Sequence, residues 1–257
     1  MKQLRAFLFV LLIALFYINY IQNRITNFEK LSIKVNSKER FYFVSTNYKK
    51  LKNKNPPIYI FLHGITLNWE QDEELKKNYY KINNLAEKYN FIAIFPQGSK
   101  GSCDWENGKY KNYYCWSTSK EIDRNFIKLL ADKVVSDYKA NKDKIFLSGF
   151  SNGAFFVVDY IFRHEDNDFT GYGIHSGGGY LLKKDKINKY KQRFYIFMSV
   201  GDHDEYQYNQ MKDLYKTFLK LNWKENINIK FYEFRGFHKI NIDSIEKEIK
   251  FFLNNND

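Results

Sequence analysis

The chain has 257 residues, 44% of them hydrophobic, which is enough for one domain with a sizeable core but cramped for two. Its formal net charge of +12 is spread along the whole sequence and accompanies no nucleic-acid motif. We therefore expect a lysine-rich solvated surface and no nucleic-acid partner. The Cys and His residues show no metal-ligand spacing, so we expect no metal.

The first 23 residues have the features of a targeting segment. Lys2 and Arg5 precede an uncharged, mostly apolar run from Ala6 to Asn23, as in a secretory signal. This run of 18 residues is near the lower limit for spanning a bilayer, and bulky residues stand where a signal peptidase would need small ones. We expect an uncleaved signal-anchor in preference to a cleaved signal peptide. Residues 24–257 then form one domain that is secreted or held on the outer side of a membrane.

Beyond this segment, residues 22–38 are polar and predict a linker or an edge strand. Short β-rich runs then alternate with longer helical ones, and several strand runs, such as IYIFLH and FIAIFP, are continuously apolar. Such runs suit strands buried on both faces, so we predict an α/β fold with a mainly parallel sheet flanked by helices on both faces. The expected strands are Arg40–Ser45, Ile58–His63, Phe91–Phe95, Lys144–Ser148, Gly171–His175, Tyr195–Val200 and Ile227–Phe234. The expected helices are 121–139, 206–221, 241–253 and the run AFFVVDYIF.

The strongest local signal is the sequence GFSNG at 149–153, which lies between the strand run KIFLS and the helical run AFFVVDYIF. A G-x-S-x-G sequence in this context is the nucleophile elbow of α/β-hydrolases. The turn is tight, so the flanking positions need glycine, and the helix N-terminus faces developing negative charge. We predict that Ser151 is the nucleophile and that the backbone N–H of Asn152 is one oxyanion-hole donor. The alternative is an ordinary glycine-rich turn into a helix.

In this fold the acid and the histidine follow the nucleophile, in that order. His238 lies just past the last expected strand, where its ring can reach over the sheet to the serine, so we predict that it is the base. His164 and His203 are expected at the surface or in a turn. His175 ends a strand and could line the pocket, but it precedes every acid candidate.

The acid is expected after the strand run YIFMSV, where Asp202 and Asp204 both qualify. At least one of them must be only a turn aspartate. The second oxyanion donor is expected in the loop after strand Ile58–His63, where Gly64 allows close backbone approach to a substrate oxygen. The backbone N–H of Ile65 or of Thr66 is the candidate.

The loop from 98 to 119 leaves the C-terminal end of a strand and should hang beside the active-site mouth. Cys103 and Cys115 lie within it, and an even cysteine count in an exported protein predicts a disulfide that closes the loop locally. Aromatic side chains of the loop could stack on a planar acyl group or a sugar ring, or could simply pack the loop. The substrate-binding candidates are Trp105, Tyr114 and Trp116.

With these residues in place, the chain resembles the polyhydroxybutyrate depolymerase and feruloyl esterase group of secreted α/β-hydrolases. The resemblance runs from Tyr59 to His238 and rests on the sequences IFLHG, FPQG, SGFSNGA and Cys115-Trp116 followed by Asp123. The acid of this group usually stands three residues after a glycine. Gly201 and Asp204 match that spacing, so the resemblance favours Asp204 over Asp202. The residues after Asp204, and Phe237 before the histidine, depart from the group's pattern in loops that line the pocket.

These residues together predict a serine carboxylesterase without a cofactor. The resemblance implies that it hydrolyses short or aromatic acyl esters, of the feruloyl, acetyl or polyhydroxyalkanoate type, on a small molecule or a polymer. A peptidase or amidase of the same fold is an alternative, because a Ser-His-Asp triad does not distinguish ester from amide substrates. A non-catalytic surface-binding protein with the same fold is the third hypothesis, because fold alone does not prove activity.

Overall fold

We describe the protein from a computed structural model, which describes residues 27–52, 54–68, 71–103, 110–163, 168–179 and 194–255. The expected targeting segment at 1–23 lies outside these ranges. Within them, no helix combines the length and the apolar character that crossing a membrane requires.

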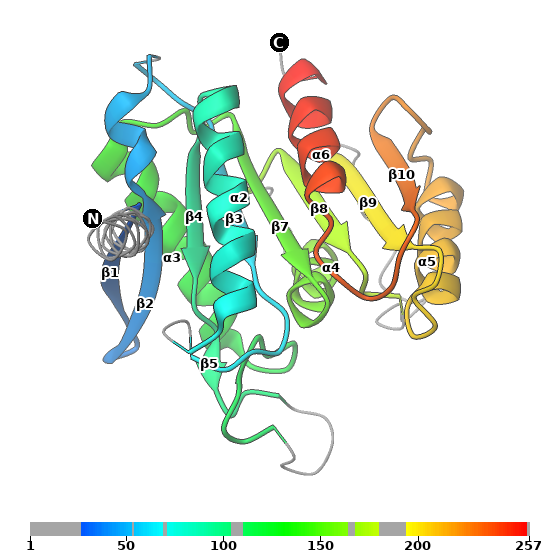
Figure 1. The fold of residues 1–257 in the computed structure, drawn as a ribbon, viewed down its shortest axis with the longest axis horizontal. Helices are drawn as coiled ribbons and strands as arrows, with labels where there is room; N and C mark the ends of the chain where they lie inside the picture. Colours follow the sequence, from blue (N-terminus) through cyan, green and yellow to red (C-terminus); the bar gives the residue numbers. More distant parts are fainter. Residues whose placement is uncertain are drawn as a thin grey trace, which may run out of the picture.

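An eight-stranded sheet forms the centre of the described structure, in the order β1-β2-β4-β3-β7-β8-β9-β10 (Figure 1). At one edge, β1 (Phe28–Val35) and β2 (Lys38–Ser45) form an antiparallel hairpin, and β2 is also antiparallel to β4 (Ile92–Pro96). All other neighbours are parallel. The remaining strands of the sheet are β3 (Ile58–Leu62), β7 (Ile145–Phe150), β8 (Gly171–His175), β9 (Tyr195–Gly201) and β10 (Ile229–Phe234).

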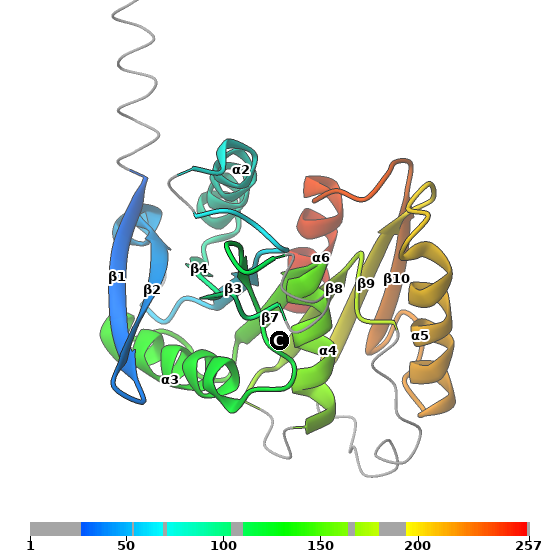
Figure 2. The same cartoon turned by 90° about the horizontal axis from the view of Figure 1, so that it is seen from below.

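Helices cover both faces of this sheet (Figure 2). On one face lie α2 (Glu73–Tyr89) and α6 (Ile242–Asn255), which contact each other. On the other face lie α3 (Glu121–Tyr138), α4 (Asn152–Arg163) and α5 (Tyr208–Lys220). Two short elements complete the described chain. They are the 3₁₀ helix η1 (Thr46–Lys50) and a two-stranded ribbon of β5 (Ser99–Lys100) and β6 (Tyr114–Cys115).

The central strand β3 shows why the sheet is buried on both sides. Ile58, Ile60 and Leu62 point into the core beneath α3, α4 and α5, whereas Tyr59 and Phe61 point into the core beneath α2 and α6. All five side chains are fully buried. Because strand side chains alternate with a period of two, a continuously apolar strand fills two cores at once. The fold class predicted from the sequence is confirmed.

Two elements differ from the sequence-based expectations. The polar stretch at 22–38 contains the edge strand β1, so of the two predictions for it the edge strand is correct. The helix α2 was not predicted. The Asp72 carboxylate accepts from the Leu75 N–H and caps its N-terminus, and its buried face includes Leu75, Tyr79 and Ile82 at helical spacing.

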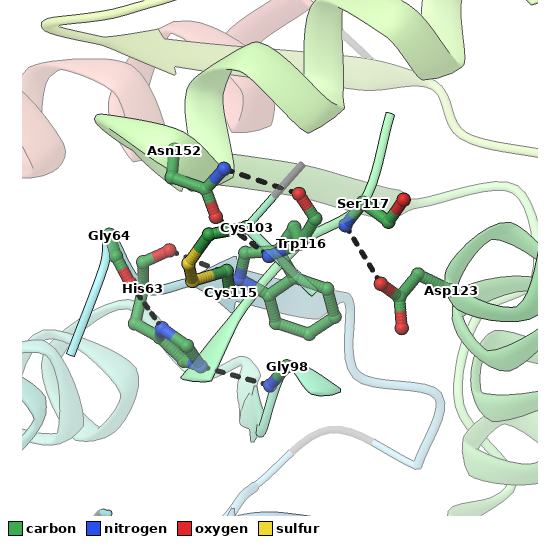
Figure 3. Close-up of a disulfide and its surroundings, with 9 residues drawn as sticks. All are labelled: His63, Gly64, Gly98, Cys103, Cys115, Trp116, Ser117, Asp123 and Asn152. Atoms are coloured by element: carbon green, nitrogen blue, oxygen red, sulfur yellow. Dashed lines mark hydrogen bonds between the residues drawn. A yellow bond between two sulfur atoms is a disulfide. The ribbon is translucent and has the colours of Figure 1, made fainter. Parts of the chain in front are cut away.

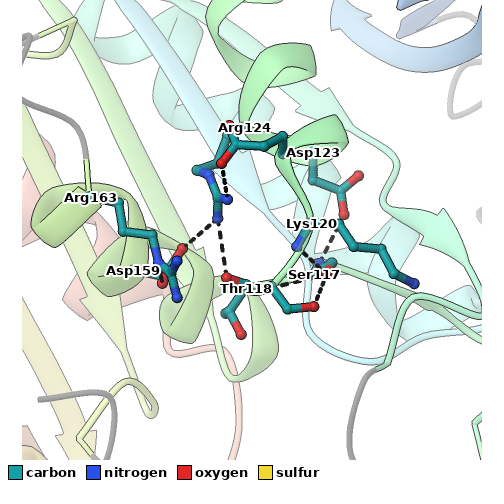
Figure 4. Close-up of polar contacts among 9 residues, drawn as sticks. Ser117, Thr118, Lys120, Asp123, Arg124, Asp159 and Arg163 are labelled. Atoms are coloured by element: carbon teal, nitrogen blue, oxygen red, sulfur yellow. Dashed lines mark hydrogen bonds and ion pairs between the residues drawn. The ribbon is translucent and has the colours of Figure 1, made fainter. Parts of the chain in front are cut away.

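A buried polar network fixes the start of α3 against α4 (Figure 4). The Arg124 guanidinium donates to the Asp159 carboxylate at 2.9 Å and to the Thr118 carbonyl at 3.1 Å. The Asp123 carboxylate accepts from the Ser117 N–H at 2.8 Å. Charge-assisted hydrogen bonds of this kind are stronger than neutral ones. They hold the chain that leads from β6 into α3, where the Trp116 N–H also donates to Asn152 at the start of α4.

Candidate active site

Ser151 stands on a sharp turn between β7 and α4. Its φ angle of 53° lies in the left-handed region, which a non-glycine residue occupies only when its surroundings enforce it. The turn is tight: a Cβ added at Gly149 would collide with the backbone of Gly153, and one at Gly153 would lie 2.5 Å from the Leu62 carbonyl oxygen. The two glycines of G-x-S-x-G are therefore steric requirements of the turn that carries Ser151.

The structure brings Ser151, His238 and Asp204 into one hydrogen-bonded line. His238 Nε2 lies 3.0 Å from Ser151 Oγ, and His238 Nδ1 lies 2.8 Å from Asp204 Oδ2. Asp204 is 1% exposed, and its other carboxylate oxygen accepts from the Gln207 N–H at 3.2 Å. A carboxylate only accepts, so it favours the tautomer with the proton on Nδ1. Nε2 is then free to accept from the serine hydroxyl.

Asp202 occupies a different position, on the exposed side of the same turn. Its Oδ1 accepts from the Gly236 N–H at 2.8 Å and lies 2.6 Å from His203 Nδ1. The Gly236 N–H, followed by His203, lowers the pKa of the Asp202 carboxyl. Asp202 thus holds the loop that carries His238, without touching the ring of His238. His203 is an exposed turn residue, as expected, and His164 lies outside the described residues.

The two candidates for the second oxyanion donor differ in what their amides already bind. The Thr66 N–H donates to the Tyr114 carbonyl at 3.2 Å, in a β-bridge that the Tyr114 N–H closes at 2.8 Å. The expectation for Thr66 is therefore wrong, because its donor is already used. Among the described residues, the Ile65 amide donates to none. The Asn152 amide is at the first position of α4, where helix N–H groups have no partner within the helix.

The predicted disulfide between Cys103 and Cys115 is present, with the two Cα atoms 5.4 Å apart (Figure 3). Trp116 follows it directly, but its ring turns inward and is 1% exposed. Trp116 Nε1 donates to the His63 carbonyl at 3.0 Å, and the Trp116 N–H donates to Asn152 Oδ1 at 2.7 Å. The expectation that Trp116 binds substrate is corrected: the ring is a core residue that supports the elbow from below.

The His63 ring links the end of β3 to the segment that follows β4. His63 Nε2 accepts from the Gly98 N–H at 2.9 Å, and His63 Nδ1 lies 2.5 Å from the Gly64 carbonyl oxygen (Figure 3). A backbone N–H can only donate, so Nε2 must be unprotonated and the ring neutral. Burial lowers the pKa of His63 from 6.5 to about 4. These two hydrogen bonds fix the loop that carries Ile65.

Comparisons with known proteins identify the family of this chain. Residues 50–188 match the family Esterase PHB depolymerase. The chain belongs to this family. A relative, the bifunctional acetylxylan esterase/xylanase XynS20E of Neocallimastix patriciarum, is 24% identical over 103 residues, which cover 40% of this chain and 13% of that protein. The chain therefore spans only a small part of that relative's length.

Solved structures share the fold of this Esterase PHB depolymerase member. A CE1 ferulic acid esterase from Anaeromyces mucronatus superposes with a TM-score of 0.63 at 19% identity, covering 87% of this chain and 89% of that one. The S-formylglutathione hydrolase FrmB of Staphylococcus aureus gives a TM-score of 0.63 at 16% identity, with 88% and 98% covered. At these identities the likeness establishes the α/β-hydrolase fold.

Of the other expected substrate-binding residues in this esterase-family chain, Tyr114 is partly exposed, and Trp105 lies outside the described residues. Two exposed aromatic residues that were not predicted stand close in sequence to His238 and Asp204. Phe237, next to His238, is 68% exposed, and Tyr206, two residues after Asp204, is 77% exposed. They are the residues at which the sequence departs from the group's pattern.

A buried carboxylate beneath the elbow was also missed. Glu248 of α6 is fully buried, and its Oε2 lies 2.7 Å from His175 Nε2 and 2.8 Å from the Tyr59 hydroxyl. Burial, followed by the charge of Glu248, raises the pKa of Tyr59 well above its usual value. The His175 carbonyl accepts from the Ser151 N–H at 2.9 Å. The buried pair of His175 and Glu248 therefore supports the end of β8, to which the Ser151 turn is bonded. His175 therefore does not line the pocket.

The sequence contained a signal for Glu248. It stands on the apolar stripe of its helix, between Ile245, Ile249 and Phe252, where an unpaired carboxylate would be costly. A charged residue on such a stripe indicates a buried partner. In the described part of the chain, no group of three or more His, Cys, Asp or Glu residues is placed to hold a metal ion.

Proposed function

We propose that this chain is a serine carboxylesterase in which Ser151, His238 and Asp204 form the catalytic triad. The observation that supports this most is the hydrogen-bonded line from a buried carboxylate through an imidazole to a strained serine, with separations of 2.8 and 3.0 Å. Membership of an esterase family supports the same reaction class.

In the proposed reaction, Ser151 Oγ attacks the ester carbonyl carbon while its proton passes to His238 Nε2. The carbonyl oxygen becomes an oxyanion, which accepts from the amides of Ile65 and Asn152. Collapse of this intermediate breaks the bond to the alcohol oxygen, which takes the proton from His238. Water then attacks the acyl-enzyme, His238 accepts its proton, and the acid leaves as Ser151 Oγ is protonated again.

Asp204 acts through His238. Its buried carboxylate keeps the Nδ1 proton in place and stabilises the imidazolium that forms when Nε2 takes the serine proton. The Gln207 N–H holds the Asp204 side chain in the required orientation. No cofactor enters this reaction.

We propose short or aromatic acyl esters as substrates, on a small molecule or a polymer. The printed names of the relatives, an acetylxylan esterase and a ferulic acid esterase, support this class. Phe237 and Tyr206, which are exposed and close in sequence to His238 and Asp204, offer apolar contact to an acyl group or to the alcohol it esterifies. Tyr114 remains a candidate contact further along the same edge.

The test is turnover by the full-length chain on acetyl, butyryl, hydroxycinnamoyl and polyhydroxyalkanoate esters, with matched anilides to represent the peptidase alternative. We expect ester turnover, and little or no amide turnover. Faster cleavage of the anilides would favour the peptidase. No turnover on any ester, from protein that folds and carries the disulfide, would favour the non-catalytic alternative.

The location is a proposal as well. The basic, then apolar, residues 1–23 would direct the chain to the outer side of a membrane, as a signal-anchor or a cleaved signal. The disulfide supports this location, because disulfides form and persist in an oxidising compartment. Fractionation of cells that express the full chain tests this: cytosolic protein would contradict it.

A further inference from the structure

An open groove of about 480 Å³ lies at the C-terminal edge of the sheet, between the β1–β2 hairpin and the β5–β6 ribbon. Pro96 at the end of β4 pairs with Tyr42, and the Gln97 N–H donates to the Phe41 carbonyl. The start of β2, from Lys38 to Arg40, therefore extends past the end of β4 and forms one wall. This wall and the C-terminal end of β7, which Ser151 directly follows, lie at the same edge of the sheet (Figure 1).

The groove is strongly basic. Five cationic side chains and one carboxylate line it. Arg40 is buried and pairs with Asp123 at 2.7 Å behind the wall, whereas the four lysines are exposed to solvent. The single lining carboxylate, Glu39, accepts from the Ser32 hydroxyl at 2.7 Å. The cationic residues are Lys30, Lys38, Arg40, Lys100 and Lys120.

The rest of the lining offers contacts of a different kind. Residues with side-chain amides and hydroxyls line the groove together with Phe41 and Tyr114. Amides and hydroxyls pair with sugar hydroxyls, and flat rings pack against sugar faces. The amide and hydroxyl residues are Asn68, Gln97, Ser99 and Ser102.

Two backbone connections join the groove to the loop at 63–66, which carries the Ile65 amide. A Cβ at Gly64 would lie 3.2 Å from Ser151 Cβ, and two residues later Thr66 forms its bridge with Tyr114 of the groove wall. Two extended residues span about 7 Å and neighbouring strands lie about 5 Å apart, so the groove begins within roughly 15 Å of Ser151. The second connection is the bond from the Gly98 N–H, in the groove, to His63.

We propose that this groove binds the carboxylate-bearing part of a polymeric ester substrate, namely a polysaccharide with uronic acid residues, whose acyl group is cleaved at Ser151. The inference rests on the proposed esterase function and specifies its substrate. Four lysine residues exposed to solvent around one opening favour an anion, although each contact alone contributes little. In the sheet, β2, which carries Lys38, stands three strands away from β7, which leads to Ser151, and this is about 14 Å at the usual spacing of strands. The carboxylate therefore stands on a different sugar residue from the acyl group, so an oligomer or polymer is required.

The first experiment compares two ester substrates of the full-length chain, which carry the same acyl group on oligosaccharides with and without a uronic acid. For the unchanged protein, we expect a KM about five- to ten-fold lower for the uronate-bearing ester at low salt, and convergence of the two values at high salt. The double variant Lys38→Gln/Lys100→Gln should bring the two KM values together at low salt as well. Lys34→Gln is the control, because Lys34 is exposed on β1 but does not line the groove.

The second experiment measures binding without turnover, so it separates this inference from the esterase proposal. Calorimetric titration of the full-length Ser151→Ala chain with oligogalacturonate should show binding that the two lysine substitutions weaken about five-fold. Inorganic phosphate should compete poorly. Equal KM values for the two esters, binding unaffected by the lysine substitutions, or phosphate binding as tightly as oligogalacturonate would overturn the inference. Lysine-dependent binding of oligogalacturonate, with no esterase activity in the unchanged chain, would support the groove as a uronate site and overturn the esterase proposal together with cleavage at Ser151.

Discussion

The neutral, buried ring of His63 predicts a specific loss of stability in acid. His63 Nε2 accepts from the Gly98 N–H. A proton added to Nε2 would point at this N–H, so protonation of the ring breaks the hydrogen bond and sets two donors against each other. Burial is the largest cause of its low pKa. The Gly64 carbonyl and the more distant Asp72 and Asp123 raise the pKa, and Arg40 lowers it. The balance of all these groups leaves His63 neutral in the folded protein at neutral pH.

The size of the effect follows from the two pKa values. The pKa is 6.5 in the unfolded chain and about 4 in the folded protein, and one pKa unit corresponds to about 1.4 kcal/mol. Because the folded pKa is the lower one, the unfolded chain binds the proton first as the pH falls. The contribution of His63 is therefore fully present above pH 6.5 and declines as the pH falls to about 4, with a total loss of about 3 kcal/mol.

The assay is urea unfolding followed by tryptophan fluorescence, at several pH values from above 6.5 down to about 4. His63→Gln can keep both hydrogen bonds through its amide without titrating, so its free energy of unfolding should fall about 3 kcal/mol less over this range. His203→Gln, which removes an exposed histidine, is the control and should follow the unchanged protein. Parallel pH curves for the His63→Gln variant and the unchanged protein would refute the reasoning.

Three further predictions concern the surroundings of Ser151. Asp204→Asn should lower kcat by on the order of 10⁴-fold, because the amide permits the wrong tautomer of His238, whereas Asp202→Asn should have a much smaller effect; similar losses in both variants would contradict the assignment. Glu248→Ala should reduce the free energy of unfolding by about 3–5 kcal/mol, because it removes the partner of His175 at a buried position. Asp243→Asn, at an exposed carboxylate in the first turn of α6, is its control, and equal effects of the two would refute the buried pair as a brace. Removing the disulfide by Cys103→Ala/Cys115→Ala should cost about 2–4 kcal/mol in thermal or urea unfolding, and unchanged stability would show that the loop is held without it.

The sharp turn at Ser151 could be predicted because its constraints are local. Steric limits require glycine at 149 and 153, and the end of a parallel strand places whatever follows it at the edge where Ser151 stands. The choice between Asp202 and Asp204 is not local. It depends on which carboxylate faces inward after the turn, and there the structure places Asp204 against His238 and Asp202 against Gly236.

The orientation of side chains in the loop at 98–119 could not be predicted, because it depends on contacts distant in sequence. Trp116 turns inward because Asn152 and His63 supply partners for its two N–H groups. Thr66 loses its free amide because Tyr114, far along the chain, pairs with it. The helix α2 and the buried Glu248, by contrast, left readable signals in an Asp cap and in a charge on an apolar stripe.

The most direct test of the account is covalent labelling of the full-length chain with a fluorophosphonate, which reacts with an activated serine hydroxyl. We predict a single phosphonyl adduct on the peptide that contains Ser151, loss of esterase activity in proportion to labelling, and no adduct in Ser151→Ala. In His238→Ala the labelling should be slower by orders of magnitude, because the base is missing. Esterase activity that persists with Ser151 fully modified, or in pure Ser151→Ala protein, would contradict the central claim.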